Sequence, residues 1–329
     1  MKLLLTIAYF VISSSLVYAQ DSVFSQYFLV PETLNPGFTG FYESTNVGII
    51  HRSRLSERDF KINTDFAYIN TFIESMSSGI GLNIVNNNES FTNYNFAQIN
   101  LNYAYRVQIS ETLFFRPAIE IGYGNKSFGF NNINLEDQIN ISNGSINPVS
   151  NENLSLYDKL FFFDMSTGVV VNNEDGWIGM SLKHINRPNI SLLANKNVAL
   201  PMLFSVNAGY KLKLRDYLDI IYFPYTTSLL FNVNYIKQGN YSRADIGSAF
   251  IYDKFYLGIN ASFTPDKQSI NSRFLRSVNL YGGLQFNHYQ FGYSYEVSAM
   301  KINNGGGNHE LYFKYEFDLY SKCYVCPSK

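Results

Sequence analysis

Histidines are the first candidates for chemistry in this chain of 329 residues, because they serve as metal ligands and as acid–base catalysts. The four histidines are His51, His184, His288 and His309. None of them stands at a metal-ligand spacing from another histidine or from a cysteine. We therefore interpret them as ordinary polar residues of the fold, and we expect no metal site and no cofactor.

The two cysteines, Cys323 and Cys326, form a C-x-x-C pair close to the end of the chain. In a thioredoxin-like setting this spacing performs redox chemistry. No strand–helix–strand pattern surrounds the pair here. A local disulfide and no role at all both stay open, and four-cysteine metal binding would need a second pair.

Acidic residues are a third candidate, since paired carboxylates catalyse glycoside hydrolysis at defined separations that a sequence does not reveal. The carboxylates in question are Glu120, Glu296, Glu310 and Glu316. We interpret them as interior charges that pair with cations, and the candidate cations are Arg116, Lys183 and Lys314. No G-x-S-x-G elbow and no phosphate-binding glycine loop occurs. We expect that the protein is not an enzyme.

Composition narrows the class of protein. The chain holds 26 Tyr and 28 Phe, only 16% of its residues are charged, and its formal net charge is −1. Disordered chains have few aromatics, and proteins that bind nucleic acid need a basic face, so both classes are excluded.

The first nineteen residues have the features of a secretory signal peptide. Lys2 is followed by the apolar run 3–12 and by a small-residue cleavage site at 17–19. We expect cleavage before Gln20 and export of the rest, which has no unbroken apolar run long enough for a spanning helix.

Strict alternation of apolar and polar residues dominates the remaining sequence. In residues 255–263, for example, Phe255, Leu257 and Ile259 alternate with Tyr256 and Gly258. Such alternation predicts strands with two different faces, and about fourteen such runs occur. Their centres lie near Ile49, Thr64, Leu82, Leu101, Ile119, Val169, Met180, Val206, Leu230, Gly247, Ile259, Leu280, Tyr293 and Tyr315.

A soluble sandwich and a membrane barrel both use such strands, and the polar faces distinguish them. These faces consist mostly of Gly, Ser, Asn, Gln and Tyr rather than Lys and Glu, and aromatics gather at the ends of the runs. We therefore predict an all-β fold, a transmembrane antiparallel outer-membrane β-barrel of about fourteen strands in contact with membrane lipid. An arginine at the outward position Ile259 should destabilise it, and an arginine at the polar-face position Ser262 should be far milder.

The predicted domains are a signal peptide (1–19), an N-terminal periplasmic or plug segment (20–45), the barrel (46–318) and a C-terminal tail (319–329). Residues 24–40 of this segment carry aromatics, two prolines and little charge, which argues against a lipid-facing strand. We expect it to lie at the periplasmic mouth or in the lumen, with the tail emerging on the same side. It either plugs the barrel or presents aromatic residues to a periplasmic partner. Its candidate residues are Phe24, Gln26, Tyr27, Asn35, Pro36 and Phe38.

Several stretches resemble the PorP/SprF family of Bacteroidetes membrane proteins. They are the Phe-Ser-Gln-Tyr opening and Asn-Pro-Gly-Phe block within 21–40, His-Arg-Ser-Arg at 51–54, the stretch 181–188, Leu-Pro at 200–201, Gly-Tyr-Ser-Tyr-Glu at 292–296, and the final run 307–317. The match follows the chain in order, although the Gln-Trp that family members usually show in the strand at 51–54 is missing.

The resemblance implies a role in the type IX secretion system, with its other components as partners. Members of the SprF type assist export or surface attachment of particular large adhesins, as in gliding motility, whereas members of the PorP type belong to the core secretion machinery, and the resemblance leaves both open. Two alternatives of other classes are a passive outer-membrane channel or small-hydrophobe transporter, and a lipase-like barrel enzyme, for which no serine–histidine pair is evident.

Overall fold

The computed structural model describes residues 21–55, 61–90, 92–129, 138–140, 144–147, 159–193, 196–214, 224, 227–266, 274–299 and 307–317. The expected signal peptide and the cysteine pair lie outside these residues. No helix in the described part of the chain is long and apolar enough to cross a membrane.

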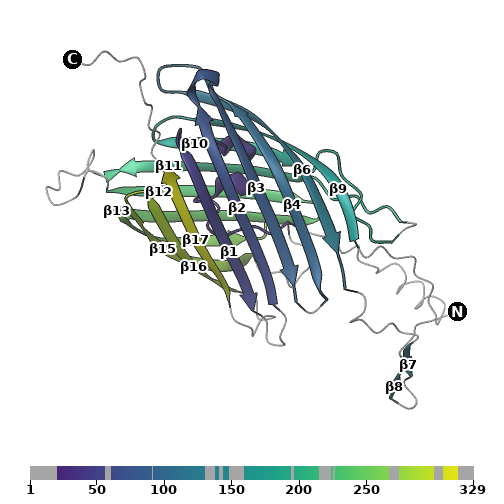
Figure 1. Ribbon diagram of the computed structural model, residues 1–329. Coiled ribbons are helices and arrows are strands. Elements are labelled where there is room, and N and C mark those ends of the chain that lie inside the picture. The colour runs from purple at the N-terminus through teal and green to yellow at the C-terminus, as the bar shows by residue number, and fades with distance from the viewer. Residues whose placement is uncertain are drawn as a thin grey trace, which may run out of the picture.

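Fourteen long antiparallel strands form the wall of the molecule in the part that the structure describes (Figure 1). They are β1 (Thr45–Leu55), β2 (Lys61–Ile73), β3 (Ser78–Glu89), β4 (Tyr94–Tyr105), β6 (Phe114–Ser127), β9 (Lys159–Asn172), β10 (Gly176–Lys183), β11 (Leu203–Lys213), β12 (Ser228–Gln238), β13 (Tyr241–Tyr252), β14 (Phe255–Phe263), β15 (Leu275–Phe286), β16 (Tyr289–Ser298) and β17 (Asn308–Phe317). Each predicted centre falls inside one of these strands, so the predicted fold class is confirmed.

The sheet closes on itself. Each strand pairs with its neighbours along the chain, β1 pairs with β17, and β4 pairs directly with β6. One short strand adds to this wall, because β5 (Val107–Gln108) pairs with β6. Two other short strands, β7 (Ile139–Asn140) and β8 (Ser145–Ile146), pair with each other in a separate ribbon. Closure satisfies the backbone hydrogen bonds that lipid cannot satisfy.

The two faces of the wall follow the predicted alternation. On β14 the side chains of Phe255, Leu257 and Ile259 are exposed on the outer face, whereas Asn260 and Ser262 are buried inside. The outer face therefore presents apolar side chains to lipid, and the interior is polar. One cluster of aromatic rings on β16 and β17 lies at the end of these strands; its members are Tyr289, Phe291, Phe313 and Tyr315.

The two ends of the barrel differ in the length of their connections. One end carries the long connections 128–158, 184–202 and 264–274, and the other carries mostly short ones, such as 74–77, 173–175 and 253–254, together with one longer one, 214–227. Outer-membrane barrels have short periplasmic turns and longer extracellular loops. We therefore assign the long-connection end to the cell surface and the short-connection end to the periplasm, which is where β1 begins and β17 ends.

Candidate functional site: the luminal segment

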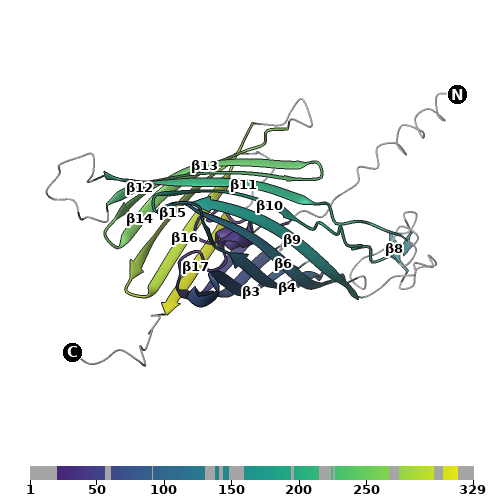
Figure 2. The same cartoon turned by 90° about the horizontal axis from the view of Figure 1, so that it is seen from above.

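Residues 21–44, which precede β1, fill the lumen of the barrel (Figure 2, purple). They contain two short 3-10 helices, η1 (Pro31–Thr33) and η2 (Pro36–Phe38), each of which has proline at its start. Proline fixes φ and lacks an N–H, so it suits the first position of a helix and cannot extend a sheet. The sequence therefore forms a compact coil here rather than a further strand. We call residues 21–44 the luminal segment.

All six candidate residues of this segment lie inside the lumen. Phe24, Gln26, Tyr27, Asn35, Pro36 and Phe38 are buried. The ring centroid of Phe24 lies 6.4 Å from that of Phe66, and the Tyr27 hydroxyl donates a hydrogen bond to Asn232 Oδ1 at 2.5 Å. Because these contacts are with the inner wall, the segment has the geometry of a plug, and neither Phe24 nor Tyr27 is displayed to a partner in this arrangement.

Asn35 fixes the middle of the luminal segment. Its side-chain oxygen accepts a hydrogen bond from Gly37 N at 2.8 Å, which caps η2. Its side-chain amide donates to the carbonyl oxygens of Val169 at 3.0 Å and of Met180 at 3.2 Å. One side chain thus both begins a helix and joins it to strands β9 and β10.

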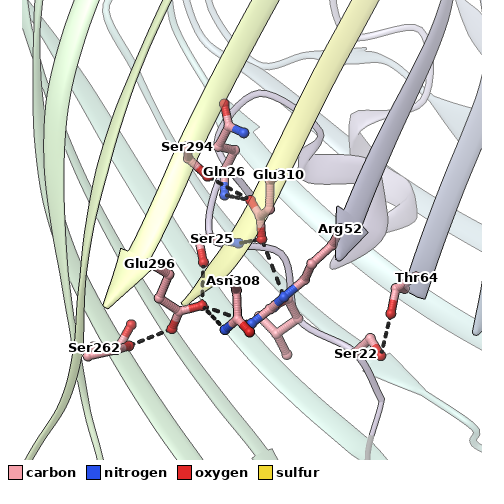
Figure 3. A network of polar contacts seen from close by, with 12 residues as sticks. Ser22, Ser25, Gln26, Arg52, Thr64, Ser262, Ser294, Glu296, Asn308 and Glu310 are labelled. Carbon is pink, nitrogen blue, oxygen red and sulfur yellow. Dashed lines mark hydrogen bonds and ion pairs between the residues drawn. The ribbon is translucent and has the colours of Figure 1, made fainter. Parts of the chain in front are cut away.

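Glu310 holds the backbone of the segment. Its carboxylate, on the inner face of β17, accepts hydrogen bonds from the backbone N–H groups of Ser25 at 2.7 Å and Gln26 at 3.1 Å (Figure 3). Arg52 Nε lies 3.7 Å from the same carboxylate. A charged acceptor that serves two backbone donors forms stronger hydrogen bonds than a neutral one.

Glu296 holds the same region from β16. Its Oε2 accepts from Arg52 Nη2 at 2.8 Å, from the Ser25 hydroxyl at 3.0 Å and from Asn308 Nδ2 at 2.8 Å (Figure 3). Arg52 also donates to the carbonyl oxygen of Val23. Arg52, Glu296 and Glu310 therefore form a network that binds the segment to β1, β16 and β17.

His184 holds the first residues of the segment near the cell-surface end. It lies just after β10, and its ring contacts Asp21 Oδ2 at 2.7 Å and Asp164 Oδ2 at 2.8 Å. Burial alone lowers the pKa of His184, but the two carboxylates outweigh burial and raise that pKa to about 10. Burial likewise raises the pKa of Asp21, and the charge of His184 outweighs it and lowers that pKa to about 2. At neutral pH an imidazolium therefore lies between two carboxylates.

Glu32 introduces a titratable group into the middle of the segment. Its side chain is buried, and Oε1 accepts a hydrogen bond from Asn70 Nδ2 at 2.9 Å. Burial raises the pKa of Glu32 to about 7, and the charge of Lys314 opposes this only in part. The luminal segment thus carries a carboxyl group that changes its charge near neutral pH.

The segment runs through the lumen from one end to the other. Asp21 N donates to Gln238 Oε1 at 2.8 Å, at the cell-surface end of β12, and Gly40 approaches Gly79 and Thr71 at the periplasmic end. The segment therefore does not lie at the periplasmic mouth alone: it starts near the cell surface and reaches the periplasmic end where β1 begins. The predicted C-terminal tail lies outside the described residues.

The predicted partners of the interior carboxylates are right in part. Lys183 Nζ lies 3.4 Å from Glu120, and Lys314 Nζ lies 3.4 Å from Glu316. Arg116 instead pairs with Glu43 of the luminal segment at 3.2 Å. Glu296 and Glu310 pair with Arg52, a residue of the His-Arg-Ser-Arg motif at 51–54 that is not among the predicted cations. It shares one face of β1 with Asn46, Gly48 and Arg54, and this mostly polar face is the signal that would have placed it in the lumen.

The histidines divide between the two faces of the wall. His184 is buried in the lumen, whereas His51 Nδ1 contacts Asp65 Oδ1 at 2.6 Å and His309 Nδ1 contacts the Tyr293 hydroxyl at 2.8 Å, both toward the outside. Within the described ranges, no group of three His, Cys, Asp or Glu side chains has the arrangement of a metal site.

A closed antiparallel barrel with an apolar outer face and a filled polar lumen is an outer-membrane β-barrel protein. The family described as "Type IX secretion system membrane protein PorP/SprF" matches residues 16–315, and this chain belongs to that family. It is therefore an outer-membrane component of the type IX secretion system. No curated protein matches the chain.

Solved structures with a similar fold are outer-membrane barrels. The toluene transporter TodX of Pseudomonas putida has a TM-score of 0.52 and 9% sequence identity, with 86% of this chain and 93% of that chain covered. The CymD monoaromatic hydrocarbon channel has a TM-score of 0.52 and 11% identity, with 92% and 95% covered. At these identities the likeness concerns the fold alone.

Proposed function

We propose that this protein is a closed accessory barrel, without catalytic activity, that assists the export or surface attachment of specific large adhesin-type substrates. Family membership supports the secretion role. The filled lumen is the observation that favours an accessory barrel over a barrel through which the substrate passes. Residues 21–44 occupy the interior from one end to the other, so a large substrate has no path through this barrel in the arrangement seen. Its contribution would then come from surfaces that contact other components of the secretion system.

The periplasmic mouth offers such a surface. Tyr42, at the end of the luminal segment, is 47% exposed, and with Phe41, Trp177 and Tyr256 it lines a cavity of about 370 Å³ that opens at this end. Aromatic side chains are favoured anchors of protein interfaces. We propose that a periplasmic component of the secretion system contacts this mouth. The residues that contact it are then Phe41 and Tyr42, rather than the buried Phe24 and Tyr27.

One observation favours a second function, a small-hydrophobe transporter. A cavity of about 70 Å³ lies between the luminal segment and the wall, and much of its lining is apolar. Its apolar lining includes Phe24, Phe66, Phe96, Ile190, Leu200 and Leu203. A transporter of this kind would take up a small apolar compound in reconstituted vesicles, whereas the accessory barrel would not.

Deletion of the gene, followed by mass spectrometry of cell-surface and culture-fluid proteins, tests the proposal. We expect the loss of one or a few large secreted adhesins. Loss of every substrate of the secretion system would identify a core component instead, and an unchanged set of secreted proteins would contradict the export role.

Complementation with Tyr42→Ala then tests the periplasmic surface. We expect it to restore the barrel but to reduce adhesin export. Tyr105→Ala is the matched control, because Tyr105 is a tyrosine of similar exposure, 44%, on β4 near the same end. Equal export by both variants would contradict the assignment of the surface.

A further inference from the structure

Four arginines gather around one cavity at the cell-surface end of the lumen. The cavity has a volume of about 300 Å³ and lies between the first residues of the luminal segment and the wall. Its arginines are Arg52 and Arg54 of β1, Arg243 of β13 and Arg276 of β15. A second cavity of about 140 Å³ is lined by the same four arginines. Four positive charges this close together repel one another unless negative groups lie nearby.

Two of the four guanidinium groups have that counter-charge in the protein. Arg52 pairs with Glu296 and Glu310, and Arg243 Nε lies 2.8 Å from Asp245 Oδ1. These pairs are buried, and each carboxylate is already held by further hydrogen bonds. The other two arginines of the cavity are Arg54 and Arg276.

Arg54 and Arg276 have no carboxylate within ion-pair distance among the described residues. The guanidinium of Arg276 lies over the Tyr241 ring, 5.1 Å from its centroid, which leaves the edge of the guanidinium fork available. Asp21 also lines the cavity, but its carboxylate is bonded to His184 and Gln238. The cavity therefore presents two guanidinium groups, those of Arg54 and Arg276, that have no ion-pair partner among the described residues.

A β-bulge brings Arg276 into this group. Ser262 of β14 pairs with Ser277, but the next residue, Phe263, pairs with Leu275, so Arg276 is an extra residue in the ladder. Without the bulge, alternation would carry Arg276 to the outer face together with Val278. A bulge interrupts a ladder locally and redirects a side chain. Here it adds a guanidinium to a cavity that already holds three.

We propose that this cavity binds a phosphate group that enters from the cell-surface end. A guanidinium matches the oxygens of a phosphate with two parallel hydrogen bonds. A phosphate monoester carries a charge of about −1.5 to −2 at pH 7, and its oxygens can accept hydrogen bonds from both Arg54 and Arg276, the two arginines without an ion-pair partner among the described residues. An acidic peptide would spread the same charge over two separate carboxylates, which fits a single compact cavity less well. The site stands apart from the export role, since it depends only on the wall and on residues 21–23.

The phosphate has two possible sources, a soluble phosphate compound and a phosphorylated lipid headgroup. The purified full-length protein in detergent, in a phosphate-free buffer of low ionic strength, is titrated with sodium pyrophosphate by calorimetry. The same protein is then tested for binding to two kinds of phospholipid vesicle, one with and one without a lipid whose headgroup ends in a phosphate monoester. The variants are Arg54→Gln/Arg276→Gln and the control Arg187→Gln, which removes an exposed arginine at the same end that does not line the cavity.

We expect pyrophosphate to bind the wild type and Arg187→Gln alike and the double variant at least about tenfold more weakly, because the double variant lacks the two guanidinium groups that donate to the phosphate oxygens. Retained heat-modifiable migration in electrophoresis verifies that each variant is folded. If binding occurs only on vesicles that contain the phosphate-monoester lipid, and the double variant loses it, the result supports the site and identifies a lipid headgroup as the source of the phosphate. Equal affinity of all three proteins, or a preference for a peptide with two aspartates over pyrophosphate, would overturn the proposal.

Discussion

The guanidinium of Arg52 lies 2.8 Å from the carboxylate of Glu296 and joins β1 to β16, two strands that are separated by β17. Arg52 also donates to the Val23 carbonyl, and Glu296 accepts from the Ser25 hydroxyl. The same ion pair therefore braces the wall and holds the luminal segment. Removing one partner of a buried pair leaves the other charge uncompensated, which is costly.

Glu310→Ala should loosen the luminal segment while the barrel stays closed. The change removes the acceptor of two backbone N–H groups, at a cost of about 2–3 kcal/mol to docking. The probe is a cysteine introduced as Gln26→Cys in a chain with both native cysteines replaced by serine. This cysteine should react faster with a water-soluble maleimide when Glu310→Ala is present than when Glu310 is retained. Glu174→Ala, in an exposed periplasmic turn, is the control and should leave the rate unchanged. Equal rates in the two variants would show that Glu310 does not hold the segment.

Docking of the luminal segment should weaken as the pH rises from about 4.5 to about 7. Glu32 has a pKa of about 7 when docked and about 4.5 when it is in water, so the docked state binds the proton more tightly. Its stabilising effect is complete below pH 4.5, amounts to about 3 kcal/mol, and is lost as the pH rises through 7. The measurement is the labelling of Gln26→Cys relative to an exposed Glu174→Cys at each pH. Glu32→Gln should abolish this dependence, and a dependence that survives would rule out Glu32 as its source.

Arginine on the outer face should destabilise the barrel in proportion to its depth in the membrane. Ile259→Arg, in the middle of β14, should cost about 2–4 kcal/mol in lipid, whereas Phe255→Arg, at the periplasmic end of the same face, should cost about 0–1 kcal/mol. Urea unfolding in lipid vesicles measures both values. A larger cost at Phe255 would mean that the membrane boundary has been placed wrongly.

Phe24→Ala/Tyr27→Ala should leave barrel assembly intact and still reduce export of the proposed adhesin-type substrate. The two changes remove the contacts with Phe66 and Asn232 inside the lumen, and the fourteen-strand hydrogen-bond ladder does not depend on them. Heat-modifiable migration reports assembly, and mass spectrometry of surface proteins reports export. Normal export from a folded variant would contradict a role of the docked segment, and loss of assembly would mean that the segment is needed to build the wall.

Alternation along the sequence predicts the strands and their faces, because in every strand apolar side chains face the lipid and polar side chains face the lumen. This pattern can be read within each strand without knowledge of its neighbours. It does not predict contacts between distant residues, such as Arg52 with Glu296, or the bulge that redirects Arg276. It predicts that arginine is far milder at Ser262 than at Ile259, but it does not show what Ser262 contacts inside the lumen. Ser262 is buried and is bonded to Arg243 and Asp245, so a further cation there would meet an existing one. A polar face in the sequence does not reveal whether the lumen behind it is empty.

The direction of the luminal segment is another feature that the sequence leaves open. Proline and low charge exclude a lipid-facing strand for residues 21–44, but they fit a coil at the mouth as well as one through the lumen. The contact of Asp21 with His184 decides between these, because it joins residues 163 positions apart. The choice depends on tertiary partners rather than on local propensity.

Conductance in planar lipid bilayers tests the filled lumen most directly. The full-length protein is compared with a variant that lacks residues 22–39, after heat-modifiable migration has verified that both are folded. We predict no steady ionic current from the full-length barrel and a steady current from the deletion variant. A full-length barrel that conducts steadily, at the same level as the deletion variant, would contradict the account.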